Sequence, residues 1–260
     1  MDKNTLERIK GKINEIEKVP ITAKVLLYSD PGIGKTTCAA LSPKPLIVNC
    51  EGGTLCLDKF KGFYEALDIK VIRPDTIEDI QNIFWYLKSG DHDRETVILD
   101  SLGEIQKMSM DEILRNPRRD PKHDADTPIL QDYGKNTQQM RKLIRAFRDL
   151  PMNVVFTCLS SEIKDENDGS VKVGPNLTPK LAIDTMGYVD VVGYMYSKDG
   201  TRRLLTQPKG KFMAKDRSGK LGNGMEDPTM FSIFGKITDG EITAPDFLDD
   251  ILLEVKNNEG

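Results

Sequence analysis

The chain has 260 residues, of which 38% are hydrophobic and 30% charged, as in an ordinary globular protein that is large enough to bury a core. Its formal net charge of −4 argues against a dedicated binder of duplex DNA, because such proteins are usually basic. No stretch approaches the roughly 18 apolar residues of a membrane span, and the charged N-terminus lacks the apolar segment of a signal peptide. We therefore expect a cytoplasmic protein without membrane contact.

The first segment, residues 1–20, predicts a short amphipathic helix. Leu6, Ile9, Ile13 and Ile16 recur at helical spacing and so fall on one face. Residues 241–260 predict a second terminal helix, and we expect residues 21–240 to form one domain.

The cysteines predict no metal site. None of the four forms a Cys-x-x-Cys pair, and neither histidine stands near a cysteine. Zinc sites need such clusters, so we interpret the cysteines as reduced thiols of the core. They are Cys38, Cys50, Cys56 and Cys158.

Short apolar runs alternate with helical patterns along the domain. The runs lack polar alternation, which is typical of strands covered on both faces of a parallel sheet. The pattern predicts an α/β fold, with a mostly parallel twisted sheet and helices on both faces. The runs are 24–28, 45–49, 97–100 and 153–157, and the helical patterns include Ile77 to Leu87 and Met140 to Phe147.

Two regions interrupt this alternation. Residues 116–132 are rich in Pro, Asp and Arg and predict a mobile loop. Residues 160–184 contain an Asp-Gly turn between β-prone segments and predict a protruding hairpin. Further strands are expected at 189–195, 202–207 and 212–214, so that the C-terminal third of the chain is rich in β-structure.

A glycine-rich loop follows the first apolar run and opens a helical stretch, which is the setting of a phosphate-binding loop. Gly32 and Gly34 let the backbone N–H groups approach phosphate oxygens, and Lys35 reaches the β- and γ-phosphates. The Thr36 hydroxyl is placed to bind Mg²⁺, and the helix turns its positive end toward the anion. Position 29 carries Ser where the full motif begins with Gly. The residues predicted to bind ATP are Ser29, Asp30, Pro31, Gly32, Ile33, Gly34, Lys35, Thr36 and Thr37.

Two acids that follow apolar runs complete the predicted site. Asp100 ends one run and can hold a Mg²⁺-bound water beside Thr36. Glu51 follows another run and precedes a Gly-Gly pair, at the sheet edge where ligands bind in open α/β folds. We choose Glu51 as the group that positions or deprotonates the attacking water. Glu104 is the competitor, on a helix that should point it away, and Asp30 belongs to the rim of the loop.

These segments resemble the RecA-like core of small phage P-loop ATPases, the Sak-type group proposed to act in single-strand annealing or recombination. The resemblance covers about residues 24–219 and rests on SDPGIGKT, NCEGGT and VILDS. It implies catalysis by Glu51 after the second strand and a Mg²⁺ acid in the Asp100-Ser101 pair. One departure lies at 157–161, which lack the Gln or His expected as a γ-phosphate sensor. If the chain is phage-encoded, its compartment is the host cytoplasm.

The resemblance also assigns a role to Lys215 and Arg217. Their Lys-x-Arg spacing is similar to the segment that RecA-related assemblies insert into the ATP site of a neighbouring subunit. Strand alternation over 211–217 would place both cations on one face, with Asp216 on the other. Two adjacent cations add little to the fold by themselves, so the pattern favours catalysis in trans within a homo-oligomer, as a ring or filament. A solvated strand end is the alternative.

Single-stranded DNA is the partner that the resemblance implies, with an annealing protein or a single-strand-binding protein as a further partner. The implied DNA loops carry as many acids as bases and no interleaved aromatic residues, so solvated loops are the alternative. The basic residues in these loops are Arg115, Arg118, Arg119, Lys122, Lys164, Lys172 and Lys180.

Three functions remain open on these observations. The first is a DNA-dependent ATPase that oligomerises and supports annealing or homologous recombination. The second is a small-molecule kinase that uses the same phosphate loop, and the third is a non-catalytic ATP switch that docks a replication or recombination partner.

Overall fold

The computed structural model describes residues 3–11, 21–53, 55–116, 124, 126–164 and 169–258. At the N-terminus it contains α1, Lys3–Lys10. Ile13 and Ile16 of the expected amphipathic helix lie outside the described residues, as do residues 117–123 and 125 of the expected loop.

The described residues form a ten-stranded sheet in the order β10-β8-β7-β1-β5-β4-β2-β3, with β6 added to β5 and β9 to β7. Strands β1, β2, β3, β4 and β5 run parallel, and β7 is parallel to β1. Apart from the exposed β3, these strands are buried along much of their length, which explains their continuous apolar sequences. The α/β fold with a mostly parallel sheet is thus confirmed. The strands are β1 Lys24–Ser29, β2 Pro45–Asn49, β3 Lys70–Ile72, β4 Thr96–Asp100, β5 Asn153–Lys164, β6 Val171–Pro175, β7 Val191–Lys198, β8 Thr201–Leu205, β9 Lys215–Asp216 and β10 Gly224–Glu226.

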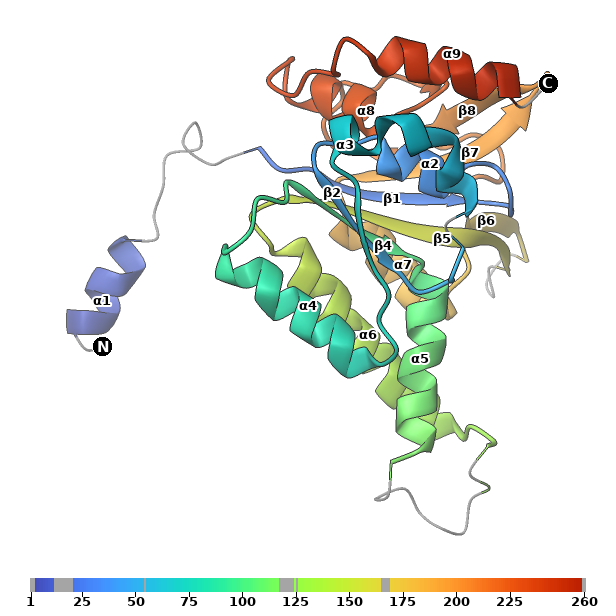
Figure 1. Cartoon of the computed structure of the whole chain (residues 1–260). Helices are drawn as coiled ribbons and strands as arrows, with labels where there is room; N and C mark the ends of the chain where they lie inside the picture. The colour runs from blue at the N-terminus through green and yellow to red at the C-terminus, as the bar shows by residue number, and fades with distance from the viewer. Residues whose placement is uncertain are drawn as a thin grey trace.

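Helices cover both faces of this sheet (Figure 1). One face carries α4, α5, α6 and α7, and the other carries α2, α3, α8 and α9. None of the described helices is long and apolar enough to cross a membrane. The helices are α2 Lys35–Ala40, α3 Tyr64–Leu67, α4 Ile77–Ser89, α5 Leu102–Leu114, α6 Leu130–Arg148, α7 Pro179–Tyr188, α8 Met230–Ile237 and α9 Leu248–Asn258, with a 3-10 segment over Leu55–Phe63.

The sheet separates two hydrophobic cores, because successive strand side chains point to opposite faces. On β1, Leu26 and Tyr28 join the core beneath α4 to α7, whereas Val25 and Leu27 join the core beneath α2 and α8. All four side chains are fully buried. This packing fixes β1, and with it the loop that follows β1, near the centre of the sheet.

The C-terminal third contains the strands expected there, with two changes. β7 and β8 form an antiparallel pair joined at Asp199 and Gly200. β5 and β6 pair antiparallel from Ser160 to Pro175, so the expected hairpin ends earlier than residue 184, because residues 179–184 belong to α7; its residues 165–168 lie outside the described residues. The prediction of a strand at 212–214 is wrong, since Phe212 forms only isolated bridges. The regular strand is shorter than the alternation over 211–217 suggests and is confined to β9.

Candidate nucleotide-binding site

The glycine-rich loop lies between β1 and α2, at the carboxyl ends of the parallel strands. Gly32 and Gly34 have φ angles of 78° and 95°, in the region that side chains with a Cβ rarely adopt. Ser29 is the last residue of β1 and is fully buried. It is not one of the residues with positive φ, so its side chain adds no strain at the start of the loop.

Lys35, the first residue of α2, folds back over the loop. Its Nζ donates to Oγ of Ser29 at 3.0 Å and to the Asp30 carbonyl oxygen at 3.2 Å. Burial lowers the pKa of the ammonium, while Glu51 and Asp100 oppose that shift as the largest of the favourable charges. Oxygen atoms of the protein therefore surround the ammonium at the place where a phosphate loop holds phosphate oxygens.

Asp100 connects the loop to two strands. Its Oδ2 accepts a 2.8 Å hydrogen bond from the Thr36 hydroxyl, and its Oδ1 accepts one from the Thr157 hydroxyl. Only 3% of Asp100 is exposed. β5 separates β4 from β1 in the sheet, so the carboxylate reaches across one strand to the loop.

These oxygens fit Mg²⁺. Within the described part of the chain, no cluster of three His, Cys, Asp or Glu side chains could hold a metal. Mg²⁺ is commonly held by one or two protein oxygens together with phosphates and water, which matches Thr36 and Asp100. Sequence reasoning missed Thr157, which orients this carboxylate, because a single Thr within an apolar run gives no signal.

Glu51 lies one strand beyond Asp100. Asn49 of β2 is in register with Asp100 of β4, and the two residues after Asn49 carry the chain to Glu51. Oε1 of Glu51 accepts a hydrogen bond from the Ser101 hydroxyl, so the residue after Asp100 orients the glutamate. The structure therefore brings together the predicted phosphate, metal and water-positioning groups.

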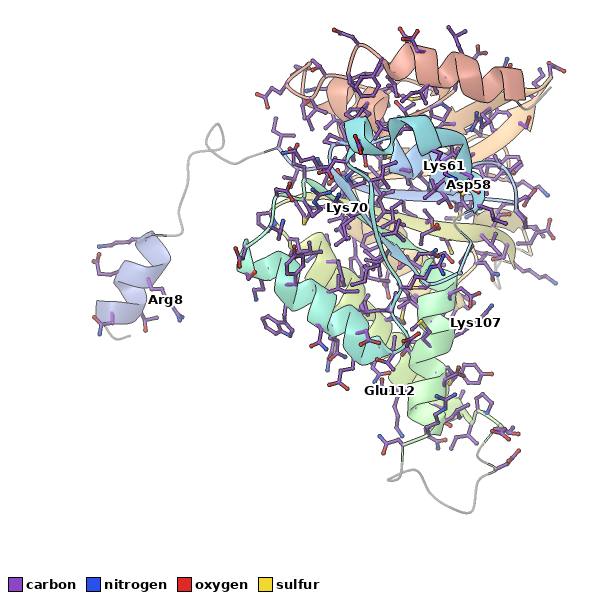
Figure 2. All side chains as sticks on the ribbon, viewed as in Figure 1. Arg8, Asp58, Lys61, Lys70, Lys107 and Glu112 are labelled. Atoms are coloured by element: carbon purple, nitrogen blue, oxygen red, sulfur yellow. The ribbon has the colours of Figure 1, made fainter. Side chains whose placement is uncertain are left out.

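Glu104 occupies the first turn of α5, as the spacing predicts. Its carboxylate forms a 2.6 Å ion pair with Lys107, which projects from the same helix (Figure 2). Glu104 and Glu51 nevertheless line one cavity of about 430 Å³, together with polar groups of α5, α6 and the start of α7. The expectation that Glu104 points away from the site is therefore wrong, since it lines the same cavity as Glu51.

The comparison with protein families identifies this arrangement. The family described as an AAA domain matches residues 21–218, about three quarters of the chain. The chain belongs to the AAA domain family. No curated protein matches it. The match spans the loop, Asp100 and Glu51, which supports a nucleotide-binding P-loop ATPase domain; the narrower resemblance to Sak-type phage ATPases stays a prediction.

Lys215 and Arg217 of the AAA domain lie away from its own phosphate loop. β9 pairs with Val191 and Val192, the first residues of β7, whereas the loop lies at the carboxyl ends of the strands. Lys215 Nζ donates to the carbonyl oxygens of Met186 and Val189, the former at 2.5 Å.

Arg217 binds the same part of α7, donating to the carbonyl oxygen of Gly187 at 2.7 Å. Both cations therefore bind carbonyl groups around the C-terminal end of α7. Each cation therefore has partners within its own subunit, because carbonyls at a helix end lack partners within the helix. Asp216 accepts from the backbone of Ser218 and Leu221.

The basic residues expected to meet DNA are divided among several elements. Lys164 ends β5, Lys172 lies on β6 and Lys180 lies on α7, all of them exposed. Arg115 caps the C-terminal end of α5, and Arg118, Arg119 and Lys122 lie outside the described residues.

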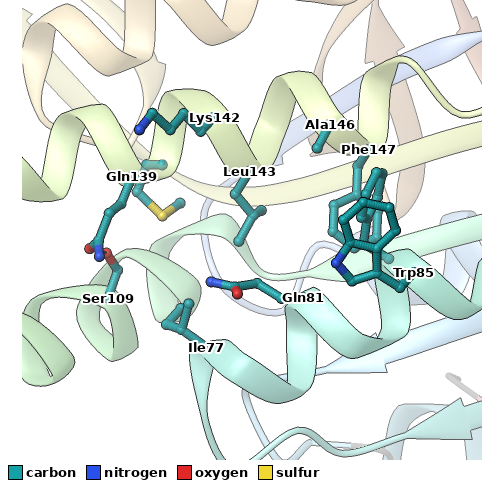
Figure 3. A pocket seen from close by; sticks show the side chains of 11 residues that line it. Ile77, Gln81, Trp85, Ser109, Gln139, Lys142, Leu143, Ala146 and Phe147 are labelled. Atoms are coloured by element: carbon teal, nitrogen blue, oxygen red, sulfur yellow. The ribbon is translucent and has the colours of Figure 1, made fainter. Parts of the chain in front are cut away.

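A separate cavity of about 280 Å³ opens between α4, α5 and α6 (Figure 3). Ile77, Gln81 and Trp85 line it from α4, and Leu143 and Phe147 line it from α6. It contains none of the residues predicted to act on a nucleotide.

Proposed function

We propose that the chain hydrolyses ATP as a homo-oligomer and that single-stranded DNA stimulates this activity, in support of annealing or homologous recombination. The observation that carries the hydrolytic part is the position of Glu51. Its carboxylate accepts a hydrogen bond from Ser101, after the strand next to β4, at the sheet edge where the proposal puts the terminal phosphate. An acid at that place can position or deprotonate the attacking water.

The loop residues bind the triphosphate in this proposal. Backbone N–H groups of the loop and Lys35 bind the β- and γ-phosphates, and Lys35 exchanges its contacts with Ser29 and Asp30 for phosphate oxygens. Thr36 and Asp100 would hold Mg²⁺, which would supply positive charge beside the β- and γ-phosphates. Glu51 receives a proton from the water as the water attacks the γ-phosphorus, and the bond from that phosphorus to the β–γ bridging oxygen breaks.

Lys215 and Arg217 support the oligomeric part of the proposal. They lie at the amino ends of the strands and do not reach the loop of their own chain. In a head-to-tail assembly that edge of one subunit can face the carboxyl edge of the next. A cation supplied by a neighbour stabilises charge in the transition state by about 10³–10⁵ in rate.

The hairpin of β5 and β6 supports the DNA-dependent part. β5 continues beyond the loop as far as Lys164, so the hairpin lies on the sheet edge that carries the candidate site. Ser160 of β5 donates a hydrogen bond to the Asp30 side chain. A strand bound by Lys164 and Lys172 would therefore act on the loop through a direct contact.

A phosphotransferase is the second candidate, and the cavity beside Glu51 favours it. The side chains of Gln106, Asn136 and Thr178 contribute to this cavity, and the Gln106 amide donates hydrogen bonds to Oδ1 of Asn136 and to the Thr178 hydroxyl. An acceptor hydroxyl in that cavity would meet Glu51 as its base. We rank this candidate second, because the residues that line the cavity in the described part of the chain include no arginine.

The rate of phosphate release with and without a single-stranded oligonucleotide separates the candidates, together with the size of the protein in ATP–Mg²⁺. The proposal expects faster release with DNA and a larger particle with ATP. DNA-independent turnover that requires a small-molecule acceptor would instead establish the kinase. Lys35→Ala should abolish binding and turnover in either case, and unchanged ATP affinity in calorimetry would refute the phosphate loop itself.

A further inference from the structure

Arg202 lies against the last glycine of the phosphate loop. A Cβ atom built on Gly34 would lie 3.1 Å from Nη1 of Arg202 and 3.3 Å from its Cδ. Arg202 belongs to β8, opposite Ser197 of β7, and is half-buried. The guanidinium of a residue far along the chain thus occupies the space beside Gly34 that a side chain would fill, next to the loop that is expected to surround phosphates.

The order of the strands indicates which end of a bound nucleotide would face which side of β1. Asp100 ends β4 and Glu51 follows β2, both on one side of β1, so we expect the terminal phosphate on that side. β7 and β8 lie on the other side of β1. A nucleotide that extends along the carboxyl edge of the sheet therefore places its α-phosphate and nucleoside toward β8, where Arg202 touches Gly34.

The chemistry of the side chain fits a phosphate at that position. A guanidinium carries five N–H donors in a planar fork and stays charged, which suits bidentate binding of a phosphate. Gly34 is the residue that permits the close approach, because any side chain there would meet Arg202 as well as adopt an unfavourable φ of 95°.

We propose that Arg202 binds the α-phosphate of the nucleotide in the site of its own chain. This inference rests on the proposed function, since it needs a nucleotide in the loop. Its consequence is specific: Arg202 contacts the part that ATP and ADP share, so it sets affinity for both nucleotides and leaves the chemical step to other groups. This separates it from Glu51, Lys215 and Arg217, which are proposed to act on the terminal phosphate.

The neighbouring residue Arg203 provides a matched control. It carries the same charge, but strand alternation turns it to the opposite face, and it forms a 2.7 Å ion pair with Glu226 of β10. Arg203→Ala and Arg202→Ala therefore remove equal charge from adjacent positions, and only the latter removes a side chain that touches the loop.

The test is calorimetry on the full chain with ADP and with a non-hydrolysable ATP analogue. Arg202→Ala should weaken both by the same factor, about 10- to 100-fold, and raise KM while kcat at saturating ATP changes less than about twofold. Arg202→Lys should recover part of the affinity, and Arg203→Ala should bind as wild type. Arg202→Gln, which keeps most of the volume, serves if the alanine variant does not fold.

Three results would overturn the inference: unchanged affinity in Arg202→Ala or Arg202→Gln, a loss of ATP affinity alone, or an equal loss in Arg203→Ala. Measuring Lys35→Ala under the same conditions distinguishes a failure of the Arg202 proposal from a failure of the nucleotide site itself. If Lys35→Ala loses nucleotide binding while Arg202→Ala keeps it, only the role of Arg202 is refuted. If Lys35→Ala binds as wild type, the nucleotide site itself is refuted.

Discussion

The Thr36 hydroxyl donates a 2.8 Å hydrogen bond to Oδ2 of Asp100, which joins two residues that are 64 positions apart in the chain. The carboxylate reaches over β5 to make this contact, and Thr157 of β5 holds its other oxygen. The acid that we expect to hold Mg²⁺ is therefore fixed relative to the phosphate loop by β1, β5 and β4.

Glu51→Gln should retain ATP affinity and lose turnover by about 10²–10⁴, because the amide still accepts a hydrogen bond from Ser101 but cannot take a proton. Glu104→Gln is the matched control, since it removes a carboxylate from the same cavity and only breaks an ion pair with Lys107. Steady-state phosphate release and calorimetry measure the two effects. A larger loss in Glu104→Gln than in Glu51→Gln would show that the helix residue is the base.

Arg217→Ala should leave ATP binding by the isolated subunit intact and remove most hydrolysis by the assembled protein. Its side chain is 55% exposed, so removing its interactions with Gly187 and Asp190 should cost at most about 1 kcal/mol of unfolding free energy. Lys215→Ala should be less stable, because its ammonium binds two carbonyl groups and such charged hydrogen bonds contribute about 1.5–3 kcal/mol each. Thermal unfolding measures the loss of stability, and steady-state turnover measures the loss of hydrolysis.

Mixing Arg217→Ala with Lys35→Ala tests catalysis in trans. Each variant supplies the half-site that the other lacks, so mixed oligomers should recover part of the turnover. If no activity returns, or if Arg217→Ala is as fast as wild type, the cations serve only the C-terminal end of α7.

Neutralising Lys164, Lys172 and Lys180 together should weaken binding of single-stranded DNA and flatten its salt dependence. Each lysine–phosphate interaction contributes about 0.7 to the slope of log affinity against log salt, so removing three of them lowers the slope by about 2. The control neutralises three exposed lysines elsewhere, Lys44, Lys70 and Lys88, on the part of the chain around β2, β3 and α4. Equal slopes in the two triple variants would mean that DNA does not bind at the hairpin.

Cysteine labelling tests the packing around the site. Burial raises the pKa of Cys38, Cys50 and Cys158 to about 12, so at pH 8 almost none of these thiols is present as the reactive thiolate. Cys56 is exposed. Iodoacetamide should therefore modify Cys56 alone in the native protein and all four cysteines in denaturant, as mass spectrometry would show. Rapid native labelling of Cys50 would mean that the turn before Glu51 is open.

The sequence by itself determined the features that depend only on neighbouring residues: the buried strands, the phosphate loop and the acids at strand ends. Short apolar runs predicted the buried parallel strands, because such strands are covered on both faces and need no polar alternation. The glycines at 32 and 34 and the following Lys-Thr pair predicted the phosphate loop, since its backbone conformation and its donors lie within nine consecutive residues. The strand ends of Asn49 and Asp100 likewise predicted where acids would converge.

The tertiary structure decided what depends on the order of strands and on the direction of side chains. Only the sheet shows that β5 lies between β4 and β1, so that Thr157 orients Asp100, and that β8 brings Arg202 to Gly34. The alternation of residues 211–217 indicated no partners for Lys215 and Arg217 within the fold. The pairing of β9 with β7 places both side chains at the C-terminal end of α7, where they bind carbonyl groups. Such contacts join residues far apart in the chain, and a local pattern carries no information about which distant backbone will supply an acceptor.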